Sequence, residues 1–209
     1  MRRFGFLAAL ALAACAHAAR GQDSVDASAG DIPPGLGTLS QDDIALTMRQ
    51  EELEIRVVPL DERVLRLLTP DTYRSLHDLA QQRAAQVDSV SRQNGVSLPG
   101  IFLVTFFGRR QGARFDPQNL NLQVRGQLFR PIGVIPYSVN FNSQQLDQRQ
   151  QATGLILFEE PVPVFETFTV SYGIASDAWE GKLTKIQRER TRVLGRLPSD
   201  STRVRPDST

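Results

Sequence analysis

The sequence has few of the residues from which reactive sites are usually built. It contains one cysteine and two histidines among 209 residues. A single cysteine excludes an intramolecular disulfide, and a chain without a thiol pair and with so few imidazoles lacks the common ligands of a zinc site. The G-x-S-x-G nucleophile motif and the glycine-rich phosphate loop do not occur in the sequence either. We therefore expect no catalytic residues, no metal and no cofactor.

An excess of one charge and long apolar runs are also missing. The 24 Lys and Arg residues nearly balance 23 Asp and Glu residues, so the whole molecule has little net field to recruit a polyanion. A membrane-spanning helix needs about 20 consecutive apolar residues, and the sequence contains no such run. We expect neither a nucleic-acid partner nor a transmembrane helix.

The N-terminus carries the pattern of a secretory signal. Arg2 and Arg3 precede an apolar run over residues 4–14, and small residues follow over 16–21. A short positive region, an apolar core and a small-residue end are typical of bacterial export signals. We predict a signal peptide over residues 1–21, and a mature protein in the periplasm or at the outer membrane, not in the cytoplasm.

Two routes of processing stay open for this signal. Residues 12–15 read Leu-Ala-Ala-Cys and resemble a lipobox, in which Cys15 would be lipidated and would become the new N-terminus. Cys15 is the only cysteine, and a lone thiol in an exported protein calls for an explanation. The alternative is ordinary cleavage after Ala18 or Gly21, where small residues stand at the required spacing. In the first case the protein reaches the membrane through a lipid anchor.

The rest of the chain divides by composition into three parts. Residues 22–48 are rich in Asp, Ser, Gly and Pro and are expected to form a flexible tether, with a short helix near 44–48. Residues 49–197 have the length and apolar content of a single globular domain. Residues 198–209 are mostly Ser, Asp, Arg and Pro, so we expect a disordered tail.

Two helices are predicted at the ends of this domain. Thr69, Pro70 and Asp71 form a helix start, and apolar residues recur at three- and four-residue steps as far as the Asn94-Gly95 stop. This pattern predicts a helix over about 69–93. A second stripe, led by Trp179 and preceded by Asp177 as the expected cap, predicts a C-terminal helix over about 177–196.

Between the helices the pattern changes to that of β-strands. The run 101–107 is apolar almost throughout, as in a central strand buried on both faces, and 155–158 is a second such run. Alternating patterns predict half-buried strands, and Pro131 and Pro136 confine one of them to a sheet edge. These strands cover the segments 53–57, 120–124, 128–129, 135–141 and 168–172.

The order of motifs in this region resembles the second half of the telokin-like, immunoglobulin-like domains of bacterial lipoproteins and secreted proteins. The matching segments are Phe115-Asp116-Pro117, Gly126 to Pro131, Gly154 to Pro161 and Phe168 to Tyr172, about a third of the chain. The resemblance implies an α+β protein with an antiparallel immunoglobulin-like β-sandwich flanked by the two helices. It also implies a role in binding or scaffolding, without catalytic residues to transfer.

The C-terminal helix offers the strongest candidate for a functional surface. Its basic residues could contact anionic lipid headgroups or an acidic partner, and they are Lys182, Lys185, Arg188, Arg192 and Arg196. The alternative is that the apolar stripe packs on the sheet and that these residues are its solvated face.

His77 could in principle act as a base, but its neighbour Asp78 does not face it on a helix, so we interpret His77 as a packing residue.

The function expected from the sequence is that of a non-catalytic cell-envelope protein, a binding or structural module whose partner is an envelope protein or the membrane surface. Two alternatives remain. A carrier would hold an apolar ligand inside the sandwich or between helix and sheet. A carboxylate-dependent envelope hydrolase would need two acids on one face, for which Asp116, Asp147 and Glu159 are the candidates.

Overall fold

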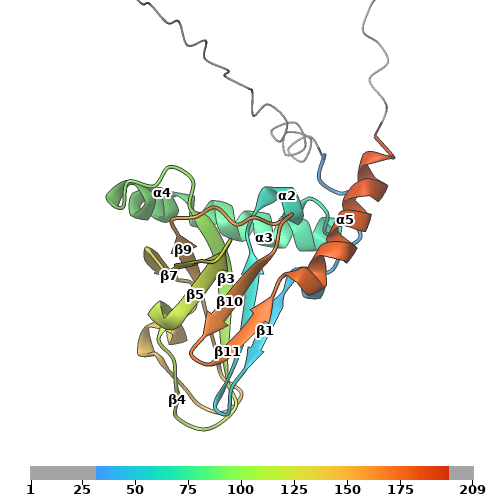
Figure 1. Cartoon of the computed structure of the whole chain (residues 1–209). Helices are drawn as coiled ribbons and strands as arrows, with labels where there is room; N and C mark the ends of the chain where they lie inside the picture. The colour runs from blue at the N-terminus through green and yellow to red at the C-terminus, as the bar shows by residue number, and fades with distance from the viewer. Residues whose placement is uncertain (1–31, 198–209) are drawn as a thin grey trace, which may run out of the picture. The chain divides into compact units, whose positions relative to one another are not determined.

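The computed structural model describes residues 32–197 (Figure 1). The predicted signal peptide with Cys15, the first part of the tether and the tail over 198–209 lie outside the described residues. The described part is an α+β structure of antiparallel sheets with helices, as expected. None of its helices is both long and apolar enough to cross a membrane, a finding that covers residues 32–197 only.

The larger sheet has five strands in the order β1-β2-β3-β9-β7, and every neighbouring pair is antiparallel. The strands are β1 (Leu46–Arg49), β2 (Leu53–Pro59), β3 (Gly100–Gly108), β7 (Gly133–Pro136) and β9 (Gln151–Phe158). The apolar run in β3 lies at the centre of the sheet, between β2 and β9, as its composition predicts. The proline-flanked β7 lies at the edge, where a missing backbone donor is tolerated, which confirms that prediction.

A second sheet has the order β11-β10-β5-β6, and a short ribbon pairs β4 with β8. The strands are β4 (Ala113–Arg114), β5 (Leu120–Val124), β6 (Gln127–Phe129), β8 (Gln145–Leu146), β10 (Phe168–Tyr172) and β11 (Ala175–Ala178). The expected strand over 135–141 ends early, because residues Val139–Ser143 form a 3-10 helix, η4. The strand β11 was not expected, because Ala-Ser-Asp-Ala has little β-propensity.

Aromatic rings from both sheets meet in the core. Phe102 on β3 contacts Phe168 on β10 with ring centroids 6.1 Å apart, and Phe106 on β3 contacts Tyr172 on β10 at 5.7 Å. Trp179 is fully buried, stacks on Phe168 at 5.0 Å and donates a hydrogen bond from its indole nitrogen to the carbonyl of Val164. The two sheets are therefore held together by large side chains that interlock in edge-to-face and stacked pairs.

Residues 32–48 are part of this core, which corrects the expectation of a tether over that stretch. Ile32 is fully buried, and Leu39 is also buried. The backbone of Leu39 forms hydrogen bonds with Leu67 and Thr69, which fix the segment along the helices. The helix expected near 44–48 is also wrong. A 3-10 helix, η2 (Gln41–Ile44), precedes β1, whose alternating burial is the pattern of a strand.

Three helices follow β2, namely α2 (Glu62–Leu65), α3 (Pro70–Gln82) and α4 (Ala84–Gln93). The start at Thr69-Pro70 and the stop at Gly95, with φ +68°, agree with the sequence prediction. The expected single helix is interrupted at Arg83, whose φ of −108° and ψ of 1° are not helical. Beyond this break Val90 of α4 packs directly against the backbone of Gly133 on β7. The break therefore redirects the chain so that α4 covers the sheet edge.

The C-terminal helix α5 runs over Glu180–Leu194, shorter than expected because residues 175–178 form β11. Trp179, Ile186 and Val193 are fully buried, which confirms the predicted apolar stripe. Asp177 does not cap the helix. Its carboxylate accepts a hydrogen bond of 2.8 Å from the backbone nitrogen of Thr47, and so links β11 to β1, which lie side by side in Figure 1.

Candidate functional site

Several turns gather at one end of the sheets, which we call the loop end. It comprises the β1–β2 turn (50–52), the β3–β4 turn (109–112) and the β10–β11 turn (173–174), together with the β4–β8 ribbon. Figure 1 shows these turns at the lower end of the molecule, away from the upper end, where the described chain begins at residue 32 and ends at residue 197. Loops carried on a rigid scaffold are common places for binding residues.

Hydrogen bonds tie these turns to one another. The side-chain amide of Gln50 donates to the carbonyl of Tyr172 at 2.7 Å, which joins the β1–β2 turn to the end of β10. The guanidinium of Arg109 donates to the carbonyl of Gln50 at 2.7 Å, which adds the β3–β4 turn. The loop end is thus pre-organised by contacts between segments that lie far apart in the sequence.

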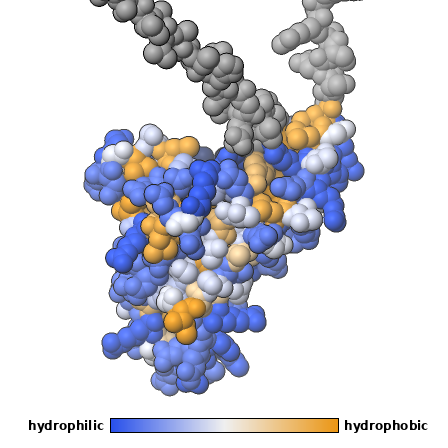
Figure 2. Space-filling view, in the orientation of Figure 1, coloured by the Kyte–Doolittle hydropathy of each residue, from blue (hydrophilic) through white to orange (hydrophobic). Residues whose placement is uncertain are grey.

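The first cavity at this end, of about 600 Å³, lies between the turns. Ile174 lines it and is fully exposed at the tip of the β10–β11 turn. Figure 2 shows a hydrophobic patch at the lower end of the surface, over this turn, surrounded by hydrophilic residues. The charged side chains around the cavity are Arg49, Glu51, Glu52, Arg109 and Arg114.

A second cavity adjoins the first and a third adjoins the second, and we call these two further cavities together the ribbon groove. The larger, of about 530 Å³, shares Arg114 with the first cavity. Its remaining lining residues are Phe115, Asp116, Asn119, Ser143, Gln144, Gln145 and Tyr172. The smaller, of about 160 Å³, shares Asp116 and Gln144 with the larger, and its walls are formed equally by polar and apolar residues. Its remaining lining residues are Pro117, Gln118, Val134, Pro136, Phe141 and Asn142.

Asp116 is held firmly at the junction of the two parts of the groove. Its backbone nitrogen donates to the hydroxyl of Tyr172 at 2.9 Å, and its Oδ1 accepts from the backbone nitrogen of Gln118, which caps the short helix η3 (Pro117–Asn119). Burial raises the pKa of the Tyr172 hydroxyl, so that this group remains protonated over the physiological range. The Asp-Pro pair gives a recognisable capping signal in the sequence, but nothing there connects it to Tyr172.

Gln144 forms the opposite wall and has an unusual backbone. It ends the helix η4 in the left-handed conformation, with φ 51° and ψ 21°. A non-glycine residue in this region costs about 1 kcal/mol, and such residues concentrate at functional sites. The backbone oxygen of Gln144 accepts a hydrogen bond of 3.0 Å from the nitrogen of Phe115, which fixes the strained residue across the groove. Sequence reasoning missed this feature, because Gln carries no signal for a left-handed backbone.

Several polar side chains of the ribbon groove are available to a ligand. Within the described range, the guanidinium of Arg114 and the side-chain amides of Asn119, Gln144 and Gln145 form no hydrogen bond or ion pair with the protein. All four side chains belong to exposed residues. They provide donors from all four groups and acceptors from the three amides, and the carboxylate of Asp116 adds another acceptor.

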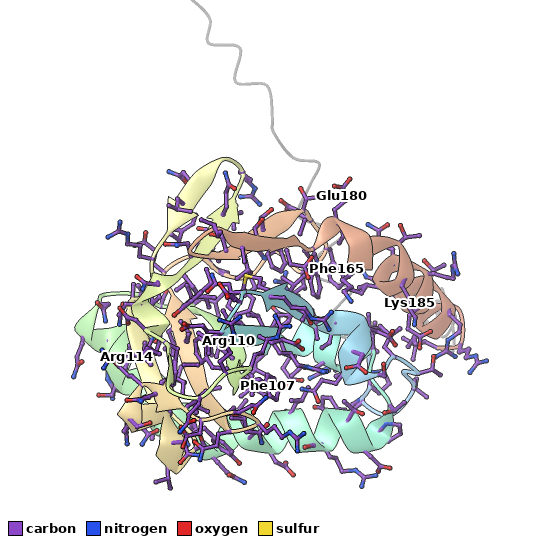
Figure 3. All side chains as sticks on the ribbon, turned by 90° about the horizontal axis from the view of Figure 1, so that it is seen from below. Phe107, Arg110, Arg114, Phe165, Glu180 and Lys185 are labelled. Carbon is purple, nitrogen blue, oxygen red and sulfur yellow. The ribbon has the colours of Figure 1, made fainter. Side chains whose placement is uncertain are left out.

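The basic residues of α5 lie elsewhere on the molecule. Figure 3, viewed from the loop end, shows Arg114 on the other side of the molecule from Lys185, which belongs to α5. Lys185 forms an ion pair of 2.6 Å with Asp43, and Lys182 donates to the carbonyl of Asp42. The pKa of Asp43 is lowered, because its hydrogen bonds with Lys185 and Ser40 outweigh its desolvation.

Arg192 is also engaged within the protein, while Arg188 and Arg196 are exposed. The anionic-surface contact predicted from the sequence therefore remains a prediction, and three of its five residues have intramolecular partners. Arg192 belongs to a buried cluster around Glu189, a residue that is only 6% exposed. Glu189 accepts hydrogen bonds from Arg192 and from the nitrogen and hydroxyl of Thr38, and these lower its pKa against the effect of burial.

His77 has a different partner from the one considered in the sequence. Its Nδ1 lies 2.5 Å from the carboxylate of Glu62 on α2, and its ring stacks on Tyr73 with centroids 5.2 Å apart. The Tyr73 hydroxyl also donates to Glu62 at 3.2 Å. Although desolvation opposes ionisation, the hydrogen bonds from His77, Arg66 and Tyr73 lower the pKa of Glu62. This half-buried group ties α2 to α3.

The three acids considered for hydrolysis are not brought into one cavity. Asp116 lines the ribbon groove, and Glu159 lines a separate cavity beside Gly95 and Gln127. Asp147 lies in the turn before β9, where its backbone nitrogen donates to the side-chain oxygen of Gln150 at 3.1 Å. Within residues 32–197 no three His, Cys, Asp or Glu side chains are arranged to hold a metal ion.

Comparison of the chain with protein-family models, with curated proteins and with solved structures finds no match.

Proposed function

We propose that this protein is a non-catalytic binding module of the cell envelope, which binds its ligand at the loop end. The main support is the continuous concave surface formed there by three adjoining cavities, linked through Arg114, Asp116 and Gln144. Hydrogen bonds between turns fix this surface before any ligand arrives. Pre-organisation of this kind lowers the entropic cost of binding.

The placement of the loop end suits an exported protein. In the proposal, the leader directs the chain across the inner membrane, and any lipid anchor at Cys15 precedes residue 32. Residue 32 lies at the opposite end of the domain from the loop end (Figure 1). The loop end is thus remote from the point at which the described chain begins.

The finer fold belongs to the same proposal. The strands β5, β6, β9 and β10 carry the residues that resemble telokin-like, immunoglobulin-like domains, and rings of β3 and β10 join the two sheets. We propose an immunoglobulin-like sandwich, in which ligands commonly bind loops at one end of the strands. Function must still be argued from the site, because this architecture hosts many roles.

The apolar-carrier alternative has less support. The space between the sheets is occupied by packed aromatic rings, such as Phe106 against Phe115 at 4.4 Å and Phe102 against Phe158 at 5.7 Å. An apolar ligand would have to displace these rings, at a cost in packing energy. Open polar cavities at the loop end are better suited to a polar ligand.

The test uses purified mature protein and cell-envelope material in a co-sedimentation assay. The variant combines Arg114→Glu with Ile174→Asp at the loop end. The control is Arg188→Glu, which changes an exposed residue of α5. We expect the first to lose at least tenfold in apparent affinity and the control to bind like the wild type. Equal binding by all three proteins would refute the loop end as the binding surface.

A second measurement addresses the non-catalytic part of the proposal. The wild type is tested on a panel of glycoside and ester substrates beside Asp116→Asn, in which the capping oxygen is retained. We expect no turnover by either protein. Turnover that disappears in Asp116→Asn would make this protein a hydrolase instead.

A further inference from the structure

The two parts of the ribbon groove differ in chemistry, and the difference defines a type of ligand. The larger part is lined by amide, hydroxyl, carboxylate and guanidinium groups, and its volume of about 530 Å³ lies within the usual range of small-ligand pockets. The smaller part has apolar walls from Pro117, Val134, Pro136 and Phe141, and the other half of its lining is polar. A ligand that matches both parts carries many polar groups and one small substituent that is itself part apolar and part polar.

The polar part is suited to the hydroxyl groups of a sugar. Each sugar hydroxyl both donates and accepts, and the side-chain amides of Asn119, Gln144 and Gln145 also offer both kinds of group. Arg114 and Asp116 bring opposite charges, so the site has no strong preference for an ion of one sign. A neutral polyhydroxyl ligand satisfies this lining better than a phosphate or a free amine does.

The small part is suited to an acetamido group. A methyl group placed there could contact Pro117, Val134 and Pro136, while Asp116 and Gln144 line both parts of the groove. From there the Asp116 carboxylate can accept a hydrogen bond from an amide N–H. The side-chain amide of Gln144 can donate to the acetyl oxygen.

We infer that the ribbon groove binds a glycan that contains N-acetylated amino sugars, with the acetyl methyl against the apolar residues of the small part. This inference rests on the proposed function, since it names the ligand class of the same loop end. It assigns Asp116 and Gln144 as the residues that distinguish the acetamido group from a hydroxyl.

The binding experiment compares two oligosaccharides that differ at one position of each sugar. The mature protein is titrated by calorimetry with a β-1,4-linked tetramer of N-acetylglucosamine and with the matching tetramer of glucose. We expect the first to bind at least tenfold more tightly, because a small apolar group with its hydrogen bonds discriminates by a factor of ten or more. Equal affinities, or no binding of either tetramer, would overturn the inference.

Two glycine variants separate the side chain of Gln144 from its backbone. Gln144→Gly removes the side chain and keeps a backbone that glycine adopts readily at φ 51°. Arg149→Gly is the matched control, because Arg149 has φ 69° and lines neither part of the groove. We expect Gln144→Gly to remain folded and to bind the acetylated tetramer at least tenfold more weakly, whereas Arg149→Gly binds normally. Equal binding by both variants would contradict the assignment.

A further binding experiment identifies the source of the sugar. Its outcomes also distinguish a failure of this inference from a failure of the proposed function on which it rests. Purified peptidoglycan glycan strands carry the same N-acetylated sugars with a lactyl ether on every second one. Binding of both strands and tetramer supports an envelope glycan, and binding of the tetramer alone supports a free glycan. If neither binds while the loop-end variant still loses envelope binding, the glycan inference fails and the proposed function stands.

Discussion

Gly37 tests whether the segment before β1 belongs to the folded core. A Cβ at this position would overlap the carbonyl group of Leu67 and lie 2.6 Å from the carbonyl oxygen of Leu68. These are backbone atoms of the connection between α2 and α3, so they cannot move as a side-chain tip can. We expect Gly37→Ala to be destabilising by about 3 kcal/mol, at the upper end of typical overpacking costs.

The chain cannot escape this strain cheaply by releasing the segment. Undocking it would break the hydrogen bonds of Leu39 with Leu67 and Thr69, each worth about 1 kcal/mol. It would also expose Ile32 and Leu39, each worth about 1.5–3 kcal/mol. The total of about 5–8 kcal/mol exceeds the estimated strain, so Gly37→Ala should remain docked in a strained native state.

The assay is thermal unfolding followed by circular dichroism. For a domain of this size, 3 kcal/mol corresponds to a fall of about 6–12 °C in Tm. Gly181→Ala is the matched control, because a Cβ there meets nothing within 4 Å on α5, and alanine favours a helix. Its Tm should be unchanged or up to about 4 °C higher. A Tm for Gly37→Ala equal to that of the wild type would refute the docking of this segment.

Three other predictions concern stability. The folded-state pKa of Glu189 is below its ordinary value of 4.5, so the stability that its carboxylate contributes is complete above pH 4.5 and is lost as the pH falls through the lowered pKa. Glu189→Gln should therefore cost about 2 kcal/mol of stability at pH 7. In a series of thermal unfolding curves, the Tm of this variant should fall less steeply with acid than that of the wild type. In Gly154→Ala the new Cβ would lie 2.5–3.0 Å from ring atoms of Phe141, so urea unfolding should show a loss of about 1–3 kcal/mol. Tyr172→Phe leaves the Asp116 nitrogen without its acceptor and should cost about 1–3 kcal/mol, with faster amide exchange at that position; unchanged exchange would contradict the hydrogen bond.

The strands and helices were predictable wherever burial leaves a periodic pattern. The central position of β3 follows from its unbroken apolar run, and the stripe of α5 follows from Trp179, Ile186 and Val193 at helical steps. The edge position of β7 follows from its prolines. In each case the residues that form the sequence pattern are also the ones whose burial or missing backbone donor sets the position of the element.

Other features of the fold depend on contacts between residues far apart in the sequence, which a local sequence pattern cannot indicate. The strand β11 has weak intrinsic propensity and forms because β10 pairs with it and Asp177 bonds to Thr47, 130 positions earlier in the chain. The ribbon groove joins 114–119 to 141–145 through the bond between Phe115 and the strained Gln144. Composition indicates only that both segments are polar, so neither the groove nor its shape was predictable.

The basic surface of α5 shows the same effect for charge. Counted along the helix, the cations outnumber the acids, which favours contact with an anionic surface. In the fold, Lys185 pairs with Asp43 and Arg192 pairs with Glu189, which also holds Thr38. These cations therefore serve in part to fasten the first described segment to the last helix.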